Sequence, residues 1–235
     1  MMMASRKLRT SVLLGAGILI ISGHLPITIS QAAARSLSTY FVPTDVDTAS
    51  SKLLAAAEPF EALAEMAYSA LGLHLERAIA DAAKAATTAR SSLPEASVAL
   101  LDVRMAEIYK ADKADDRAGL ALSSVEAYRI LVSAARPGKV PTAVNLMDYA
   151  GFRYDADFRA MPTRWSDMKD AAAYAREQWD SISSQIADPI LKQSVEAAIS
   201  DMELGADQQN TFKARRSVSA ELGLVDQLEE YFSKP

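Results

Sequence analysis

The segment 148–157 holds the densest group of side chains in this sequence that could bind a ligand. Three carboxylates stand beside two tyrosines there: Asp148, Tyr149, Tyr154, Asp155 and Asp157. Carboxylates bind hard cations, and aromatic rings attract organic cations. Asp148 and Asp155 are seven residues apart, so they share one face if the segment is helical. The pattern therefore indicates a candidate binding surface for a cation or a cationic ligand.

The same carboxylates also have a simpler interpretation as a charged helix surface. Arg153 and Arg159 lie within about one turn of them, and acid–base pairs at this spacing stabilise helices. We favour this pairing over a cation site. The two tryptophans, Trp165 and Trp179, follow on the next predicted helix. We add them to the candidate binding surface because that helix would pack beside segment 148–157.

His74 is the one imidazole that remains if the N-terminal signal described below is removed. It falls on or beside an apolar stripe, where burial would keep the ring neutral and able to coordinate a metal or accept a proton. We favour a hydrogen-bonded histidine of the core and expect no cofactor. The alternative is a metal ion or a b-type haem centred on His74, with a methionine such as Met202 as the second haem ligand.

Several chemistries need residues or motifs that this sequence lacks. It has no cysteine, which excludes a thiol nucleophile, iron–sulfur clusters and thiolate zinc sites. It has no glycine-rich phosphate loop, no nucleophile elbow and no Glu-x-x-His pair of the kind that di-iron bundles use. The formal net charge of -5 argues against a nucleic-acid partner. We therefore expect a protein that is not an enzyme and does not bind nucleic acid.

The first 34 residues have the layout of a secretory signal. Arg6, Lys7 and Arg9 precede an apolar run over 12–21, and small residues follow up to Ala34. The run is short for a bilayer-spanning helix, which needs about 20 apolar residues. We expect cleavage of residues 1–34 and a periplasmic product without stable membrane insertion, the alternative being a retained anchor. Residues 35–49 show no apolar period and are expected to form a flexible leader.

Residues 50–233 are expected to fold as a single helical-bundle domain. Aromatic residues make up only 7% of the sequence and alanine is frequent, a composition that favours close helix packing over sheets. Apolar residues recur at spacings of three and four over 59–90, 95–135, 141–161, 165–186 and 190–232. We predict an all-α fold resembling a four-helix bundle, made of a pair of long helical hairpins with one or two short extra helices such as 51–57.

Two local features of this pattern carry further expectations. The charged stretch 110–117 is expected to lie on a solvated face of one continuous helix rather than to break it near Gly119. Pro59 is expected in the first turn of its helix, where its missing N–H costs little.

A weak sequence echo relates residues 66–74 to residues 147–155. It indicates either duplicated halves, 51–135 and 141–233, or a chance likeness between alanine-rich helices. The regular apolar residues from Trp165 to Ile186 form either an internal core or a homodimer contact. Together these features predict an exported periplasmic helical-bundle protein that binds a partner protein or a small ligand.

Overall fold

The fold is all-α, as the sequence predicts. The computed structural model describes residues 44–234, so the predicted signal at 1–34 and the first part of the leader lie outside the described residues. Helices and their connections make up the described chain, which contains no strand. The helices are α1 (Thr44–Met66), α2 (Leu73–Ala89), η1 (Arg90–Ser92), α3 (Glu95–Lys113), α4 (Arg117–Ala134), α5 (Thr142–Arg159), α6 (Trp165–Ile182), η2 (Ser183–Gln185), α7 (Pro189–Asp207) and α8 (Thr211–Ser233).

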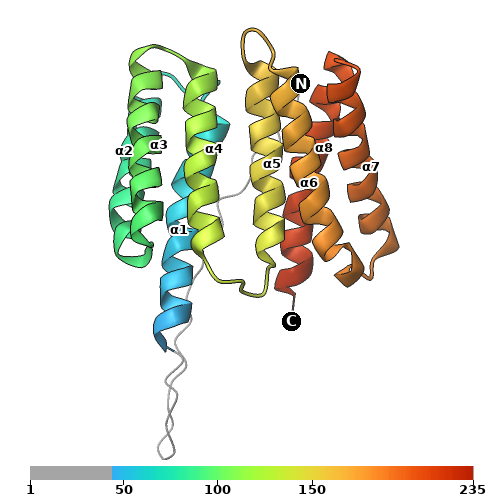
Figure 1. Ribbon diagram of the computed structural model, residues 1–235, viewed down its shortest axis with the longest axis horizontal. Helices are drawn as coiled ribbons and strands as arrows, with labels where there is room; N and C mark the ends of the chain where they lie inside the picture. Colours follow the sequence, from blue (N-terminus) through green and yellow to red (C-terminus); the bar gives the residue numbers. More distant parts are fainter. Residues whose placement is uncertain (1–43, 235) are drawn as a thin grey trace, which may run out of the picture. The chain divides into compact units, whose positions relative to one another are not determined.

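The α-helices form two consecutive groups of four (Figure 1). In α1–α4, which we call the first half, α1 packs against α2 and α4, and α3 packs against α4. In α5–α8, the second half, α5 packs against α6 and α8, and α7 packs against the same two helices. The contact between α4 and α5 joins the halves. Each half thus has four shorter helices where one hairpin of two long helices was expected.

Turns divide two of the helices that were expected to be continuous. Gly72 has a φ of 52°, which residues with a side chain rarely adopt, so the chain can reverse between α1 and α2. In the charged stretch 110–117, Asp115 is left-handed with a φ of 50°. Asp116 then caps α4, because its side chain accepts a hydrogen bond from the Gly119 N–H at 2.8 Å. The prediction of a continuous helix across Gly119 is therefore wrong.

The turn between α7 and α8 has the same construction. Gln209 is left-handed with a φ of 50°, and the Asn210 side chain caps α8 by accepting a hydrogen bond from the Lys213 N–H at 3.0 Å. The helix pairs α3–α4 and α7–α8 are alike in this respect. The sequence similarity between residues 66–74 and 147–155 does not correspond to this structural similarity. Residues 66–74 pass through a turn, whereas residues 147–155 lie inside α5.

The N-terminal helix is longer than expected. Because α1 begins at Thr44, residues 44–49 are helical rather than part of a flexible leader. Pro59 lies inside α1 and not in a first turn, so the carbonyl of Ala55 lacks its usual partner four residues on. Ala55 is an exposed residue, so this position lies on the solvent side of the helix. The helix therefore continues through the proline, and the separate short helix expected at 51–57 is part of α1.

The regular apolar residues from Trp165 to Ile186 are internal core of the second half. Trp165 is partly buried, and the other six are at most 5% exposed: Met168, Ala172, Ala175, Trp179, Ile182 and Ile186. These side chains pack on residues of α5, α7 and α8 of the same chain. They are thus not a dimer contact. Among the described helices, none is both long and apolar enough to cross a membrane.

Candidate functional site

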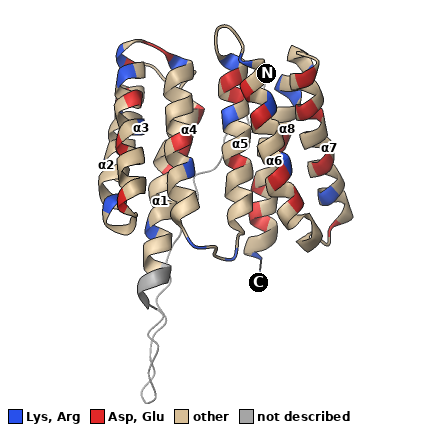
Figure 2. Cartoon of the chain, viewed as in Figure 1, with Lys and Arg blue, Asp and Glu red and all other residues tan. Residues whose placement is uncertain are grey.

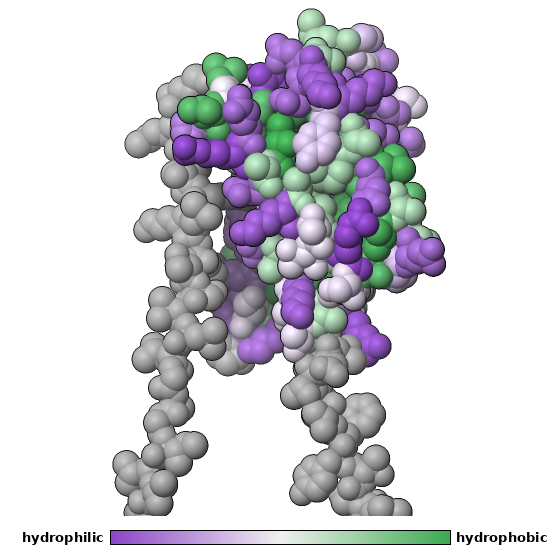
Figure 3. Space-filling view, turned by 90° about the vertical axis from the view of Figure 1, so that its left-hand side faces the viewer, coloured by the Kyte–Doolittle hydropathy of each residue, from purple (hydrophilic) through white to green (hydrophobic). Residues whose placement is uncertain are grey.

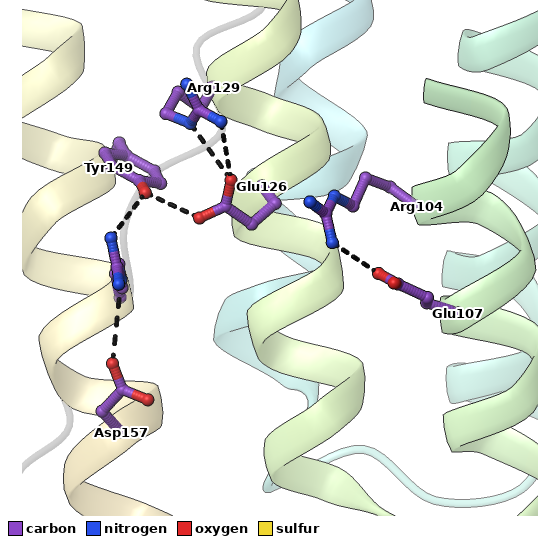
Figure 4. A network of polar contacts seen from close by, with 7 residues as sticks. Arg104, Glu107, Glu126, Arg129, Tyr149 and Asp157 are labelled. Carbon is purple, nitrogen blue, oxygen red and sulfur yellow. Dashed lines mark hydrogen bonds and ion pairs between the residues drawn. The ribbon is translucent and has the colours of Figure 1, made fainter. Parts of the chain in front are cut away.

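A network of charged and aromatic side chains joins α4 to α5 (Figure 4). Glu126 accepts a hydrogen bond from the Tyr149 hydroxyl at 2.7 Å through Oε1, and two from the Arg129 guanidinium at 3.0 and 3.1 Å through Oε2. The Arg129 guanidinium also lies over the Tyr149 ring, 5.6 Å from its centroid. Tyr174 of α6 meets that ring edge-on at 5.5 Å. These contacts hold Tyr149 where α4, α5 and α6 meet.

The network continues along α5 toward the start of α6. Arg153 donates a hydrogen bond to the Tyr149 hydroxyl at 3.2 Å, and its Nε lies 3.8 Å from Oδ2 of Asp157. A guanidinium nitrogen of Arg164 lies 3.7 Å from Oδ1 of the same carboxylate. Figure 2 shows acidic and basic residues alternating along α5 and α6. The network therefore contains its own counter-charges.

Burial governs the protonation of two groups in this network, Tyr149 and Asp157. Burial, and then the hydrogen bond to Glu126, raises the pKa of Tyr149 to about 12, so its hydroxyl stays protonated at neutral pH. Burial, and then the nearby Asp167, raises the pKa of Asp157 to about 6, although Arg153 and Arg164 oppose the shift. Asp157 is the group of this network whose charge changes close to neutral pH.

The Asp157 carboxyl should titrate with a midpoint near 6 in the folded protein. Because the folded pKa lies above the usual 3.8, the stability linked to this group is fully present below about pH 4 and is lost as the pH rises to about 6. Carbon-13 NMR of the aspartate carboxyls measures the midpoint directly. Asp167→Asn should lower that midpoint, because it removes a negative charge. A wild-type midpoint near 4 would contradict this assignment.

The structure does not gather the predicted binding residues of α5 on one surface. Tyr154 is fully buried and donates its hydroxyl to the Met202 carbonyl of α7 at 2.9 Å, away from Tyr149. Asp148 is 3% exposed. Asp155 pairs with Arg159 at 2.7 Å. Asp155 and Asp157 thus have the expected arginine partners on their own helix. Asp148 and Asp157 are buried, however, so the three carboxylates do not form a charged helix surface.

The two tryptophans serve different contacts. Trp179 is 1% exposed, and its indole N–H donates to Oε2 of Glu196 on α7 at 2.8 Å. Trp165 is partly buried at the start of α6 and meets Phe158 edge-on, with the ring centroids 6.4 Å apart. Arg176 bonds Glu203 at 3.1 Å and also Glu196 beside Trp179. The tryptophans thus attach α6 to α7 and α5 and do not line an open cleft.

His74 is exposed, which corrects the expectation that it belongs to the buried stripe. The reason is the turn at 67–72: α2 starts at Leu73, and its buried face is formed by Leu75, Ala78, Ile79 and the alanines that follow. Met202, the second haem ligand of the alternative interpretation, is fully buried in the second half, so the structure does not bring the two residues together. Within the described chain, no group of three or more His, Asp or Glu side chains could hold a metal ion.

Two features of interest were missed by sequence reasoning although the sequence carries a signal for each. Glu221 is fully buried on α8, and its spacing from Val218 and Val225 already places it on the apolar face. On α3, a second set of apolar residues at spacings of three and four lies opposite the core-facing set. A third feature, which no sequence pattern indicates, is a pocket of about 190 Å³ between α3 and α4. It is lined by Glu107, Lys110, Ala111, Ala114, Asp116, Gly119 and Ser123.

Chemically, the network between α4 and α5 is suited to holding helices together. Its carboxylates accept hydrogen bonds from arginines or form ion pairs with them. The Tyr149 hydroxyl donates a hydrogen bond to Glu126 and accepts one from Arg153. A nucleophile or general base would need a free lone pair aimed at a substrate. Comparison of this chain with protein-family models, curated proteins and solved structures finds no match.

Proposed function

We propose that this is an exported, periplasmic helical-bundle protein whose role is binding rather than catalysis. The layout of residues 1–34 supports export. The candidate residues of α5 and α6 are engaged in internal contacts, so we place the binding surface elsewhere on the molecule. The observation that carries the proposal is an apolar surface on α3 that no other helix of the described chain covers.

We call this surface the outer face of α3. It consists of residues at helical spacings of three and four, all of them exposed: Ala96, Ala99, Leu100, Val103 and Ala106. Leu100 is 50% exposed and Val103 is 51% exposed, while Leu101, Met105 and Ile108 fill the core on the opposite side of the same helix. Figure 3 shows the side of the molecule formed by α2 and α3, where green side chains lie among purple ones. A helix with two apolar faces is typical of a protein that binds a second helix.

The partner that fits this face best is a second copy of the same chain. The outer face has an acid, Glu95, at its start and a base, Lys110, at its end, both exposed. If two copies of α3 pack antiparallel about Val103, each Glu95 meets the Lys110 of the other copy, and the two valines meet at the centre. Such a contact uses the same residues on both copies, as a two-fold symmetric interface requires.

This contact would be weak. One helix pair buries much less than the roughly 1,600 Å² of a standard stable interface. The small alanine side chains allow the helix backbones to approach closely, which favours packing, but they remove little apolar area from water. We therefore expect reversible association that sedimentation detects only at high protein concentration.

Sedimentation equilibrium of residues 35–235 should show a monomer–dimer equilibrium that Val103→Asp abolishes. Ile190→Asp is the matched control, because Ile190 is 75% exposed and lies on α7. Lys110→Glu should weaken the dimer roughly tenfold, because it turns two attractive pairs into repulsive ones. The double variant Glu95→Lys, Lys110→Glu should restore it. A wild type that stays monomeric would exclude the second copy as the partner, and equal effects of the variants at 103 and 190 would exclude the outer face of α3.

A further inference from the structure

Glu221 is a carboxyl group enclosed in the interior of the second half. The residue is 0% exposed, and within the described chain neither of its carboxylate oxygens has a hydrogen-bond partner. An ionised carboxylate in such surroundings would be far less stable than in water. Burial accordingly raises the pKa of Glu221 well above its usual range. Burial therefore favours the neutral form of this side chain in the closed fold.

Gly151 of α5 provides the space that the acid occupies. A Cβ at position 151 would overlap Oε2 of Glu221 and would lie 2.6 Å from a methyl carbon of Leu222. The α5 backbone thus approaches the carboxyl group directly, because the glycine has no side chain. The packing of α8 against α5 and the position of the carboxyl group therefore depend on one another.

Apolar side chains lie above and below Glu221 along α8. Val218, three residues earlier, belongs to a core cluster with Tyr154, Met168 and Met202. Val225, four residues later, belongs to a separate cluster with Trp179 and Ile199. The acid thus lies between two apolar clusters of the second half, and water can reach it only if these helices separate.

No basic group in the described interior of the second half could balance a charge on Glu221. The helices that pack most closely against α8 are α5 and α7. None of the buried residues of α6 and α7 is titratable, and on α8 Glu221 is the one buried residue that is. The titratable groups that α5 contributes to its buried faces are Asp148, Tyr149, Tyr154 and Asp157, which are acids or phenols.

We propose that Glu221 makes the closure of the second half depend on a proton: the helices α5–α8 close around the neutral acid, and the ionised form requires α8 to move away from Gly151. The device is independent of the outer face of α3, which belongs to the first half. It provides the second half with an opening motion that responds to pH.

The direction of the pH dependence follows from linkage. The folded state holds the proton more tightly than the unfolded state, so the stability of the second half is complete below the ordinary glutamate pKa of about 4.3. Above that pH, the opened form loses its proton and gains population by up to tenfold per pH unit. The population of the opened form stops rising when the pH passes the raised pKa of Glu221 in the closed form.

Amide hydrogen exchange of the full-length protein between pH 7 and 9, above the range in which Asp157 titrates, tests this proposal. After correction for the chemical exchange rate, amides of α5 and α8 should open more with rising pH, by up to tenfold per unit, while those of α3 should not. Glu221→Gln should abolish the pH dependence in α8, because glutamine is neutral at every pH. Glu230→Gln on the same helix is the control, since Glu230 is exposed and pairs with Lys234. An unchanged slope in Glu221→Gln overturns the proposal.

Infrared spectroscopy of the wild type keeps the test decisive if Glu221→Gln does not fold. A protonated carboxyl group absorbs at a frequency separate from that of carboxylates. The wild type at pH 7 to 8 should retain the absorption of one such group, beyond the pH at which Asp157 has ionised. Complete absence of this absorption at pH 7 overturns the proposal.

Discussion

Replacing Trp179 by alanine should lower the free energy of unfolding by about 3–5 kcal/mol. The side chain is 1% exposed at the centre of the second half, and alanine would leave a cavity there. The change also removes the indole N–H that Oε2 of Glu196 accepts at 2.8 Å, a bond that links α6 to α7. Chemical denaturation followed by circular dichroism at 222 nm measures the loss.

Trp165→Ala is the matched control for this prediction. Trp165 lies on the same helix but is only partly buried, and its main ring contact is with Phe158. Trp165→Ala should lower the free energy of unfolding clearly less than Trp179→Ala does. The loss for Trp179→Phe should lie between these two values, because phenylalanine fills most of the space but leaves Glu196 without its donor. Equal losses for the two alanine variants would contradict the placement of Trp179 at the centre of the core.

Gly205→Ala should destabilise the protein by about 1–3 kcal/mol, although alanine is the better helix former. A Cβ at position 205 would lie 2.9 Å from the backbone nitrogen of Ala214 and 3.1 Å from the Tyr154 hydroxyl oxygen. Backbone atoms cannot rotate away as a side-chain end can. The substitution therefore forces α7 and α8 apart next to the turn that joins them.

Gly223→Ala should change the stability in the opposite direction. Comparing the two variants therefore distinguishes the effect of packing from that of helix propensity. Gly223 is exposed inside α8, and a Cβ there would meet nothing within 4 Å. This variant should gain up to about 1 kcal/mol, the usual advantage of alanine over glycine within a helix. Both variants are compared by chemical denaturation of the otherwise unchanged protein. A gain in stability for Gly205→Ala would mean that α7 and α8 do not approach as closely as described.

The helical class and the core of α6 could be predicted because periodicity reports which side of a helix is apolar. The turns could not be predicted in the same way, since apolar spacing continues across 67–72 and 114–116 while the backbone reverses. At Gly72 and Asp115 the deciding factor is a left-handed backbone, which periodicity does not report. The expectation that His74 is buried fails for the same reason. The apolar spacing continues through the turn at 67–72, whereas the helix does not.

The candidate site shows a second limit of sequence reasoning. The spacing of Asp155 and Arg159 was enough to predict their pairing, because both lie on one helix. The partners of Tyr149 and Trp179 lie on other helices, at Glu126 and Glu196, and no local spacing indicates such contacts. Residues that looked available for a ligand are therefore engaged in contacts that form only when the helices pack.

If the protein binds through the outer face of α3, a residue on that face must contact the partner. Site-specific photo-crosslinking in the periplasm tests this whatever the partner is, with the crosslinking residue placed at position 103 or, as control, at position 190. We predict an adduct from position 103 with the mass of two chains, and none from position 190. An adduct of another mass from position 103 alone would keep the surface but replace the second copy by a different partner. No adduct from position 103, or equal adducts from both positions, would contradict the claim.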